Sequence, residues 1–130
     1  MTRIIFALAL ATSAAAFAQG AYTVEEVSEI RDFETAVMDG QTIEAVGNDA
    51  RFEVLVKWRD PEQRPPGAPY KRVFRHVARC ADGTLAITSI TAFDDNGKVI
   101  KTYVFPPGAA EFAPAKEGSR EQRWVKQACD

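Results

Sequence analysis

The sequence predicts an α+β domain, a single antiparallel sheet of about five to six strands in meander order with a short C-terminal helix on one face. Three observations predict this fold. Apolar and polar residues alternate through the middle of the chain, an Asn-Gly pair separates two such segments, and a helix-start pattern precedes the last ten residues.

The first 18 residues have the layout of a secretory signal peptide. Arg3 precedes an apolar run, and the small residues that follow lead to Ala16-Phe17-Ala18, an A-x-A type of cleavage site. The alternative, a membrane anchor, is disfavoured because the uniformly apolar run is shorter than the roughly 20 residues of a span. No cysteine follows for lipid attachment. We expect cleavage after Ala18, which leaves residues 19–130 as one small exported domain.

The N-terminal part of this domain carries the weakest strand signals. Residues 33–39 form one candidate strand. Residues 22–30 form another, but Val24, Val27 and Ile30 also fit the spacing of a short helix, so the pattern leaves both open.

The later strands have clearer patterns. In residues 51–60 the even-numbered Phe52, Val54, Val56 and Trp58 alternate with polar or mixed residues, which predicts a half-buried strand. A Pro-rich connection over residues 61–69 follows. Further strands are predicted from their aromatic and β-branched residues at 70–81, 84–93 and 98–105, the last two joined through Asn96-Gly97.

A capping box predicts the C-terminal helix. Ser119 is followed three residues later by Gln122, so the helix should begin at Arg120. The side chains that share its apolar side are Trp124, Val125, Ala128 and Cys129. Ten residues are marginal as an isolated helix, so this apolar side must lie on the sheet.

The two cysteines of an exported chain predict one structural disulfide, Cys80–Cys129. They are too far apart for a C-x-x-C redox pair, and no His or Cys cluster accompanies them. Closing a loop of about 50 residues stabilises a fold by about 4 kcal/mol in the chain-entropy model. The disulfide therefore holds the last helix against the strand face of Cys80, which also presents Phe74, His76 and Ala78.

Charge is unevenly distributed along the predicted mature chain. Its net charge is −3, but residues 57–79 hold seven bases against two acids. Alternation places Lys71, Arg75 and Arg79 on the strand face that points away from Cys80, and Lys57 and Arg59 on the same face of the neighbouring strand. This face is either a solvated surface that keeps the sheet soluble or an anion-binding surface for glycosaminoglycan, anionic lipid or acidic protein. Nucleic acid is disfavoured by the net negative charge and by export.

No pattern in the sequence indicates catalysis, a cofactor or a metal. His76 is the single histidine, and beside Phe74 and Ala78 we expect a hydrogen-bonded packing residue. Asp94 and Asp95 lie in a predicted turn, where Asp bonds the local backbone. With no catalytic residues to assign, we expect a non-enzymatic protein.

The order of these features resembles the surface-adhesin protein E family of small exported bacterial domains. The matching features are Val56-Lys57-Trp58, a strand from Tyr70-Lys71 to Cys80, the segment from Phe93 to Val99, and "EFAPAKEGS" before the cysteine-bearing helix. The resemblance covers residues 39–129, with departures at Arg79, Phe112 and Glu117. It implies an antiparallel sheet with the helix on its concave face, and binding of host matrix components.

Two functional hypotheses follow. The first is an exported binding module that contacts host-matrix or envelope polymers through a sheet face. The second is a periplasmic structural or assembly protein that binds a protein partner, for example through an exposed strand edge.

Overall fold

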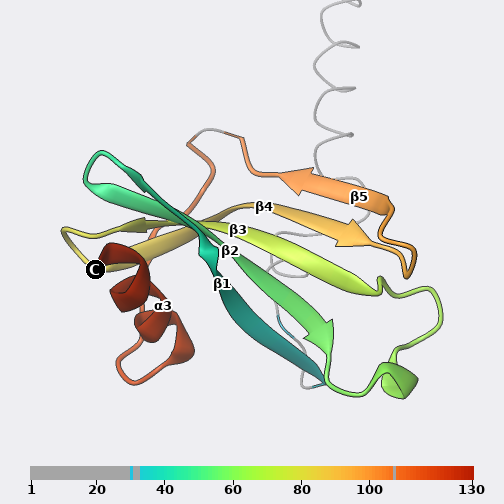
Figure 1. The fold of residues 1–130 in the computed structure, drawn as a ribbon. Helices are drawn as coiled ribbons and strands as arrows, with labels where there is room; N and C mark the ends of the chain where they lie inside the picture. Colours follow the sequence, from blue (N-terminus) through green and yellow to red (C-terminus); the bar gives the residue numbers. More distant parts are fainter. Residues whose placement is uncertain (1–29, 31–32, 107) are drawn as a thin grey trace, which may run out of the picture.

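The computed structural model describes residues 30, 33–106 and 108–130. These residues form one antiparallel sheet in the order β1-β2-β3-β4-β5, with a sixth short strand beside β4 and one helix (Figure 1). The elements are β1 Glu34–Val46, β2 Asp49–Trp58, the short 3-10 helix η1 Pro61–Gln63, β3 Lys71–Arg79, β4 Thr84–Phe93, β5 Val99–Val104, β6 Ala113–Pro114 and α3 Arg120–Cys129. The predicted α+β meander is confirmed. The predicted signal peptide, residues 1–18, and most of the candidate segment 22–30 lie outside the described residues.

Strand β1 is longer than its sequence pattern indicated. The weak candidate at residues 33–39 continues to Val46 through an irregular register between Asp39 and Glu44. Side chains replace the missing ladder bonds there: Thr42 Oγ1 donates to the Asp39 carbonyl at 2.6 Å and accepts from the Glu53 amide at 2.8 Å. This bulge interrupts the two-residue period, so alternation could not reveal the second half of the strand.

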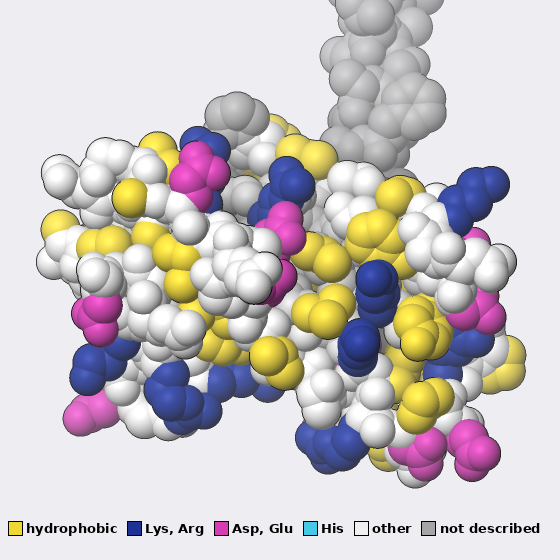
Figure 2. All heavy atoms as spheres, viewed as in Figure 1, with side chains coloured by type: hydrophobic (Ala, Val, Ile, Leu, Met, Phe, Trp, Pro, Cys, Tyr) yellow, Lys and Arg dark blue, Asp and Glu magenta, His cyan; other side chains and the backbone are white. Residues whose placement is uncertain are grey.

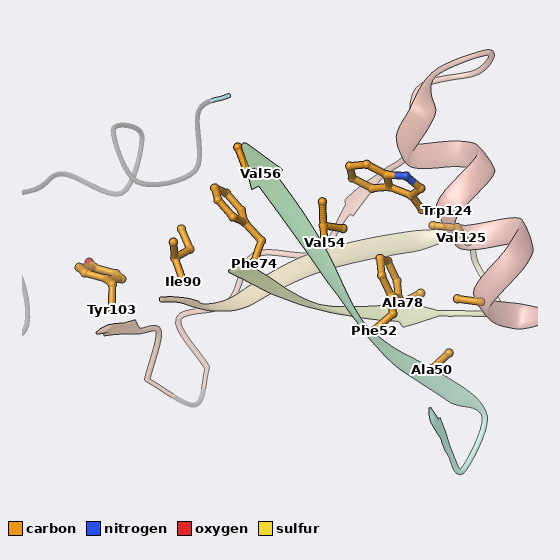
Figure 3. Close-up of a cluster of buried hydrophobic side chains, with 11 residues drawn as sticks. Ala50, Phe52, Val54, Val56, Phe74, Ala78, Ile90, Tyr103, Trp124 and Val125 are labelled. Carbon is orange, nitrogen blue, oxygen red and sulfur yellow. The ribbon is translucent and has the colours of Figure 1, made fainter. Parts of the chain in front are cut away.

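The core lies on the inner face of the sheet, which we define as the face covered by α3. Directly opposed residues of β2 and β3 supply most of it, with Val54 opposite Phe74 and Phe52 opposite His76. Figure 3 shows Trp124 and Val125 of α3 over these side chains. The predicted even-numbered burial in β2 is confirmed, since Phe52, Val54 and Val56 are at most 2% exposed. Each such side chain stabilises the fold by roughly 1.5–3 kcal/mol.

The helix begins and docks as the sequence predicted. Ser119 is the N-cap and its side chain accepts a hydrogen bond from the Gln122 amide, while Gln122 Oε1 accepts from the Gly118 amide at 2.8 Å. Trp124, Val125 and Ala128 are buried, and α3 contacts β1, β2 and β3. The Cys80–Cys129 disulfide is present, with Cα atoms 5.6 Å apart.

The hairpin between β4 and β5 follows its Asn-Gly signal. Asp94 Oδ1 accepts hydrogen bonds from the Asn96 and Lys98 amides, both at 2.9 Å, and Gly97 has a φ of 80° that favours glycine. Asp94 therefore bonds the turn backbone, as its position in the sequence indicated.

Candidate functional site

The outer face of the sheet, opposite the face covered by α3, is the candidate functional surface. Strand register aligns its residues in rows across β2, β3 and β4. One row contains Lys57, Lys71 and Phe93, the next Leu55, Val73 and Thr91, and the third Glu53, Arg75 and Ser89. Successive residues of a strand point to opposite faces, so these rows share one face and leave the core residues on the other.

Four of the five basic residues predicted for this face lie on it. Lys71, Arg75 and Arg79 follow one another along β3, and Lys57 lies opposite Lys71 on β2. Arg59 differs because β2 ends at Trp58. Its backbone amide still donates to the Phe33 carbonyl at 2.7 Å, but the ladder no longer fixes the direction of its side chain.

Arg75 and Arg79 have partners on the outer face. Arg75 Nε lies 3.0 Å from Glu53 Oε2 on the opposed strand. Arg79 lies opposite Asp49, and its guanidinium stacks 3.6 Å from the centre of the Phe112 ring. Two departures from the family pattern, Arg79 and Phe112, thus contact each other. The ion pair reduces the positive charge that Arg75 offers to a ligand, and the Phe112 ring covers part of the Arg79 guanidinium.

Lys57 and Lys71 differ from Arg75, since within the described part of the chain neither lysine forms an ion pair with an acid. Lys71 Nζ instead lies 5.1 Å from the centre of the Phe93 ring. Close by, the Arg64 guanidinium lies 5.9 Å from the Tyr70 ring, whose side chain is 40% exposed. We call this group the basic–aromatic corner: Lys57, Arg64, Tyr70, Lys71 and Phe93.

The basic–aromatic corner includes a shallow cavity of about 250 Å³. The described residues that line it are Lys57, Trp58, Pro61, Arg64, Tyr70 and Asp95. On the face shown in Figure 2, Lys and Arg side chains lie among hydrophobic ones over the end of the sheet where β2 leads to β3. A cavity with this lining can hold an anionic group and pack a flat apolar surface beside it.

Local bonds hold the Pro-rich connection in place beside the corner. The Trp58 indole Nε1 donates to the Pro69 carbonyl at 2.8 Å, and the Tyr70 amide donates to the Phe93 carbonyl at 2.9 Å. Asp60 caps η1 by accepting from the Glu62 amide. The sequence assigned no role to Arg64 and Tyr70. The segment between them contains Pro and Gly and has no periodic pattern from which a contact could be predicted.

The inner face holds an ion pair that the sequence pattern did not reveal. Arg72 Nη2 lies 2.6 Å from Glu34 Oε2, and the two side chains are 12% and 3% exposed. Arg72 lies two residues before Phe74 on β3, so its side chain is on the same, inner face of the sheet. In a pair this buried, loss of either partner deprives the other of a directly bonded opposite charge.

His76 is a buried packing residue, as predicted. It stacks on Phe52 with ring centroids 5.2 Å apart and meets Trp124 edge-on at 5.7 Å. The predicted hydrogen bond is not found at Nδ1, which is buried and has no partner among the described residues. Burial lowers the pKa of His76 to about 4, against opposing contributions from the Phe74 backbone and the Glu121 carboxylate. The imidazole is therefore neutral at physiological pH.

Two further findings concern the part of the chain that the structure describes. It contains no group of three or more His, Cys, Asp or Glu side chains placed to hold a metal ion. None of its helices has the length and apolar character needed to cross a bilayer.

A comparison with models of protein families shows the family to which the chain belongs. The model of the surface-adhesin protein E family matches residues 25–130. The chain belongs to this family. Comparisons with curated proteins and with solved structures found no match. Membership in the surface-adhesin protein E family indicates an adhesin-like binding role rather than catalysis, and an exported or cell-surface protein.

Proposed function

We propose that this surface-adhesin protein E family member is an exported binding module that contacts an acidic polymer of the host matrix or the envelope through its outer sheet face. The basic–aromatic corner is the centre of this surface. The observation that carries the proposal is the direct opposition of Lys57 and Lys71 in the β2–β3 register. Among the described residues no acid pairs with either of them.

A like-charge pair at this position is unfavourable without an anion. Directly opposed residues of antiparallel strands have Cα atoms about 4.5–5.5 Å apart, well inside the roughly 8 Å screening length of physiological salt. Like charges placed this way destabilise a sheet. A sulfate or carboxylate group bound between the two ammonium groups removes that repulsion. Binding of an anion at this position is therefore favourable.

The aromatic residues of the corner suit a polysaccharide. Tyr70 and Phe93 present flat apolar rings beside the charges of Arg64 and Lys71. An acidic sugar offers both a charged group and an apolar ring face. Asp95, which also lines the cavity, can accept hydrogen bonds from sugar hydroxyls.

The other predicted members of the anion-binding face have a secondary role in this proposal. Arg75 and Arg79 lie about 13 Å apart along the strand, four residues at roughly 3.3 Å each. A long polymer can reach them from the corner, but Glu53 and Phe112 already contact them. Arg59, just beyond the end of β2, can add to the field at the corner without a fixed contact.

Heparin, an acidic polysaccharide, is the probe for this proposal. The wild-type protein should be retained on a heparin column and elute as salt rises, because ionic contacts weaken with screening. A Lys57→Glu, Lys71→Glu variant should elute with the unbound fraction. The matched control reverses Lys116 and Lys126, which are exposed and change the net charge equally. Equal elution of the two double variants would refute the assignment to the corner.

Export is proposed on the signal-like layout of residues 1–18. Intact-mass analysis of protein from the producing cell should show a mature chain beginning at Gln19. A full-length species in the inner membrane would contradict the proposed export. It would not bear on binding through the outer face, which the heparin experiment tests.

A further inference from the structure

Strand β5 forms one edge of the sheet and presents apolar side chains to solvent (Figure 1). Val99, Ile100 and Val104 are 52%, 57% and 63% exposed. Among the described residues, β4 pairs with one side of β5 and no strand pairs with the other side. Exposed apolar side chains beside free backbone groups are the features by which a strand edge pairs with another chain.

The opposite edge of the sheet, β1, differs in ways that prevent such pairing. Its register is irregular between Asp39 and Glu44, two exposed acids, and Gly40 lies in the same segment. A bulge and charged side chains are common protections of an edge strand. In contrast, β5 pairs regularly with β4 from Lys101 to Val104. The two edges therefore differ, and β5 is the one suited to extend the sheet.

Hydrogen bonding to β4 shows which backbone groups β5 presents at its free side. The Phe105 amide donates to the Thr88 carbonyl at 3.0 Å. The backbone groups of successive residues in an antiparallel strand point to alternate sides, so those of Tyr103 also point toward β4. Thr102 and Val104 therefore point their N–H and C=O groups away from β4. The free side of β5 thus offers both donors and acceptors.

The geometry points to a second copy of this chain as the partner, with two β5 strands paired antiparallel about a two-fold axis through Thr102. A two-fold axis pairs one surface with itself. Thr102 of each copy then exchanges two backbone hydrogen bonds with Thr102 of the other. Val104 of each copy lies beside Val99 and Ile100 of the other, so the exposed apolar side chains cover one another.

The sequence of β5 favours this register over its neighbours. Directly opposed residues share a face of the sheet, so the axis must pass through one residue of the strand. An axis through Lys101 would place two like charges directly opposite each other, which destabilises a sheet. An axis through Tyr103 would place Pro106, which has no N–H to donate, in the paired segment. The axis through Thr102 avoids both, because it places Lys101 opposite Tyr103.

This inference goes beyond the proposed function and does not rest on it. The axis is perpendicular to the sheet, so the outer faces of the two copies would lie on the same side and present two basic–aromatic corners. The pairing involves one short strand from each copy, and small interfaces of this kind are weak. We expect a dissociation constant on the order of 0.1 mM.

Sedimentation equilibrium of the purified protein from about 10 µM to about 1 mM tests the association. The weight-average mass should rise towards that of two chains. Thr102→Pro removes the central donor of each copy without removing a bond to β4, and should weaken association at least tenfold, the effect of two lost hydrogen bonds. The matched control, Thr102→Val, keeps the backbone donor and should associate like the wild type.

Cysteine cross-linking tests the register independently. The two native cysteines form the Cys80–Cys129 disulfide, so an introduced cysteine is the single free thiol. In the Thr102→Cys protein the two Cα atoms would lie about 5.5 Å apart across the axis, within the range of a disulfide. In the Val104→Cys protein, at an exposed position of the same strand, they would be about 13 Å apart, four residues at roughly 3.3 Å each. Mild oxidation should therefore cross-link the first at least tenfold faster.

Three results would overturn this inference. They are the mass of a single chain at about 1 mM, association that Thr102→Pro does not weaken, and equal cross-linking of the Thr102→Cys and Val104→Cys proteins. Circular dichroism checks that each variant is folded, and if Thr102→Pro does not fold, the cysteine comparison decides. None of these measurements uses heparin, so a failure here is distinguishable from a failure of the proposed function.

Discussion

Lowering the pH from 7 to 4 should reduce the free energy of unfolding by about 3 kcal/mol more in the wild-type protein than in a His76→Phe variant. The perturbation is the proton that the imidazole binds. Burial holds the pKa of His76 at about 4 in the folded protein, against 6.5 as the ordinary value. The unfolded chain therefore binds the proton first, and acid favours unfolding.

The sign and the pH window follow from these two pKa values. Above pH 6.5 the imidazole is neutral in both states, so its full contribution to stability is present. As the pH falls from 6.5 towards 4, the unfolded state gains a proton that the folded state resists. The loss is about 2 kcal/mol at pH 5 and about 3 kcal/mol at pH 4, at 1.36 kcal/mol per pKa unit.

Urea denaturation of the two proteins at pH 7, 6, 5 and 4 measures this effect. Phe preserves the stacking on Phe52 and cannot titrate, whereas Glu111, Arg120 and Glu121 are common to both proteins and their effects cancel in the difference. The free-energy difference between the proteins should change progressively below pH 6.5. A difference that stays constant from pH 7 to pH 4 would refute the buried, neutral state of His76.

Three further predictions concern stability and docking. Cys129→Ser should lower the free energy of unfolding by roughly 2–5 kcal/mol, and equal denaturation midpoints with and without reductant would show that the disulfide does not hold α3. Trp58 and Trp124 are both 8% exposed, so acrylamide should quench the tryptophan fluorescence weakly until the protein unfolds. In a Trp58→Phe variant, which reports Trp124 alone, strong quenching of the native protein would show an undocked helix. Glu34→Ala should cost roughly 3–5 kcal/mol because it breaks a nearly buried ion pair, whereas Glu53→Ala, which breaks an exposed pair, should cost less than about 1 kcal/mol. Similar losses in the two variants would contradict the difference in burial.

Local chemistry in the sequence was sufficient to predict most of the fold. Alternation in β2, the capping box at Ser119 and the Asn96-Gly97 hairpin each act over a few residues, and the structure reproduces all three. The disulfide was predictable because an exported chain with two cysteines has one intramolecular pairing. Features that break a period were missed, above all the bulge in β1, where side-chain hydrogen bonds replace the regular ladder.

The candidate site was only partly predictable. Parity along β3 placed Lys71, Arg75 and Arg79 on one face, but no periodicity shows which acid or ring will lie opposite each base. The partners that distinguish these bases, Glu53 and Phe112, are fixed by strand register and by a distant segment. The buried Arg72–Glu34 pair was missed for the same reason, because its partner lies 38 residues away.

The surroundings of His76 had no sequence signal of their own. His76 looked like an ordinary packing residue, and its packing was predicted correctly. Whether its nitrogen finds a partner depends on how α3, β4 and the segment after β5 meet around it. That arrangement is a property of the tertiary structure alone.

A methyl NMR titration with a heparin oligosaccharide tests the central claim, binding through the outer face, most directly. Val37, Leu55 and Val73 lie in one row of that face, whereas Val54 and Val56 of β2 point into the core. The account predicts that the oligosaccharide shifts the methyl resonances of Leu55 and Val73, the row beside Lys57 and Lys71, and leaves those of Val54 and Val56 unchanged. Shifts confined to the core methyl groups or to α3, or none at a saturating concentration, would contradict it.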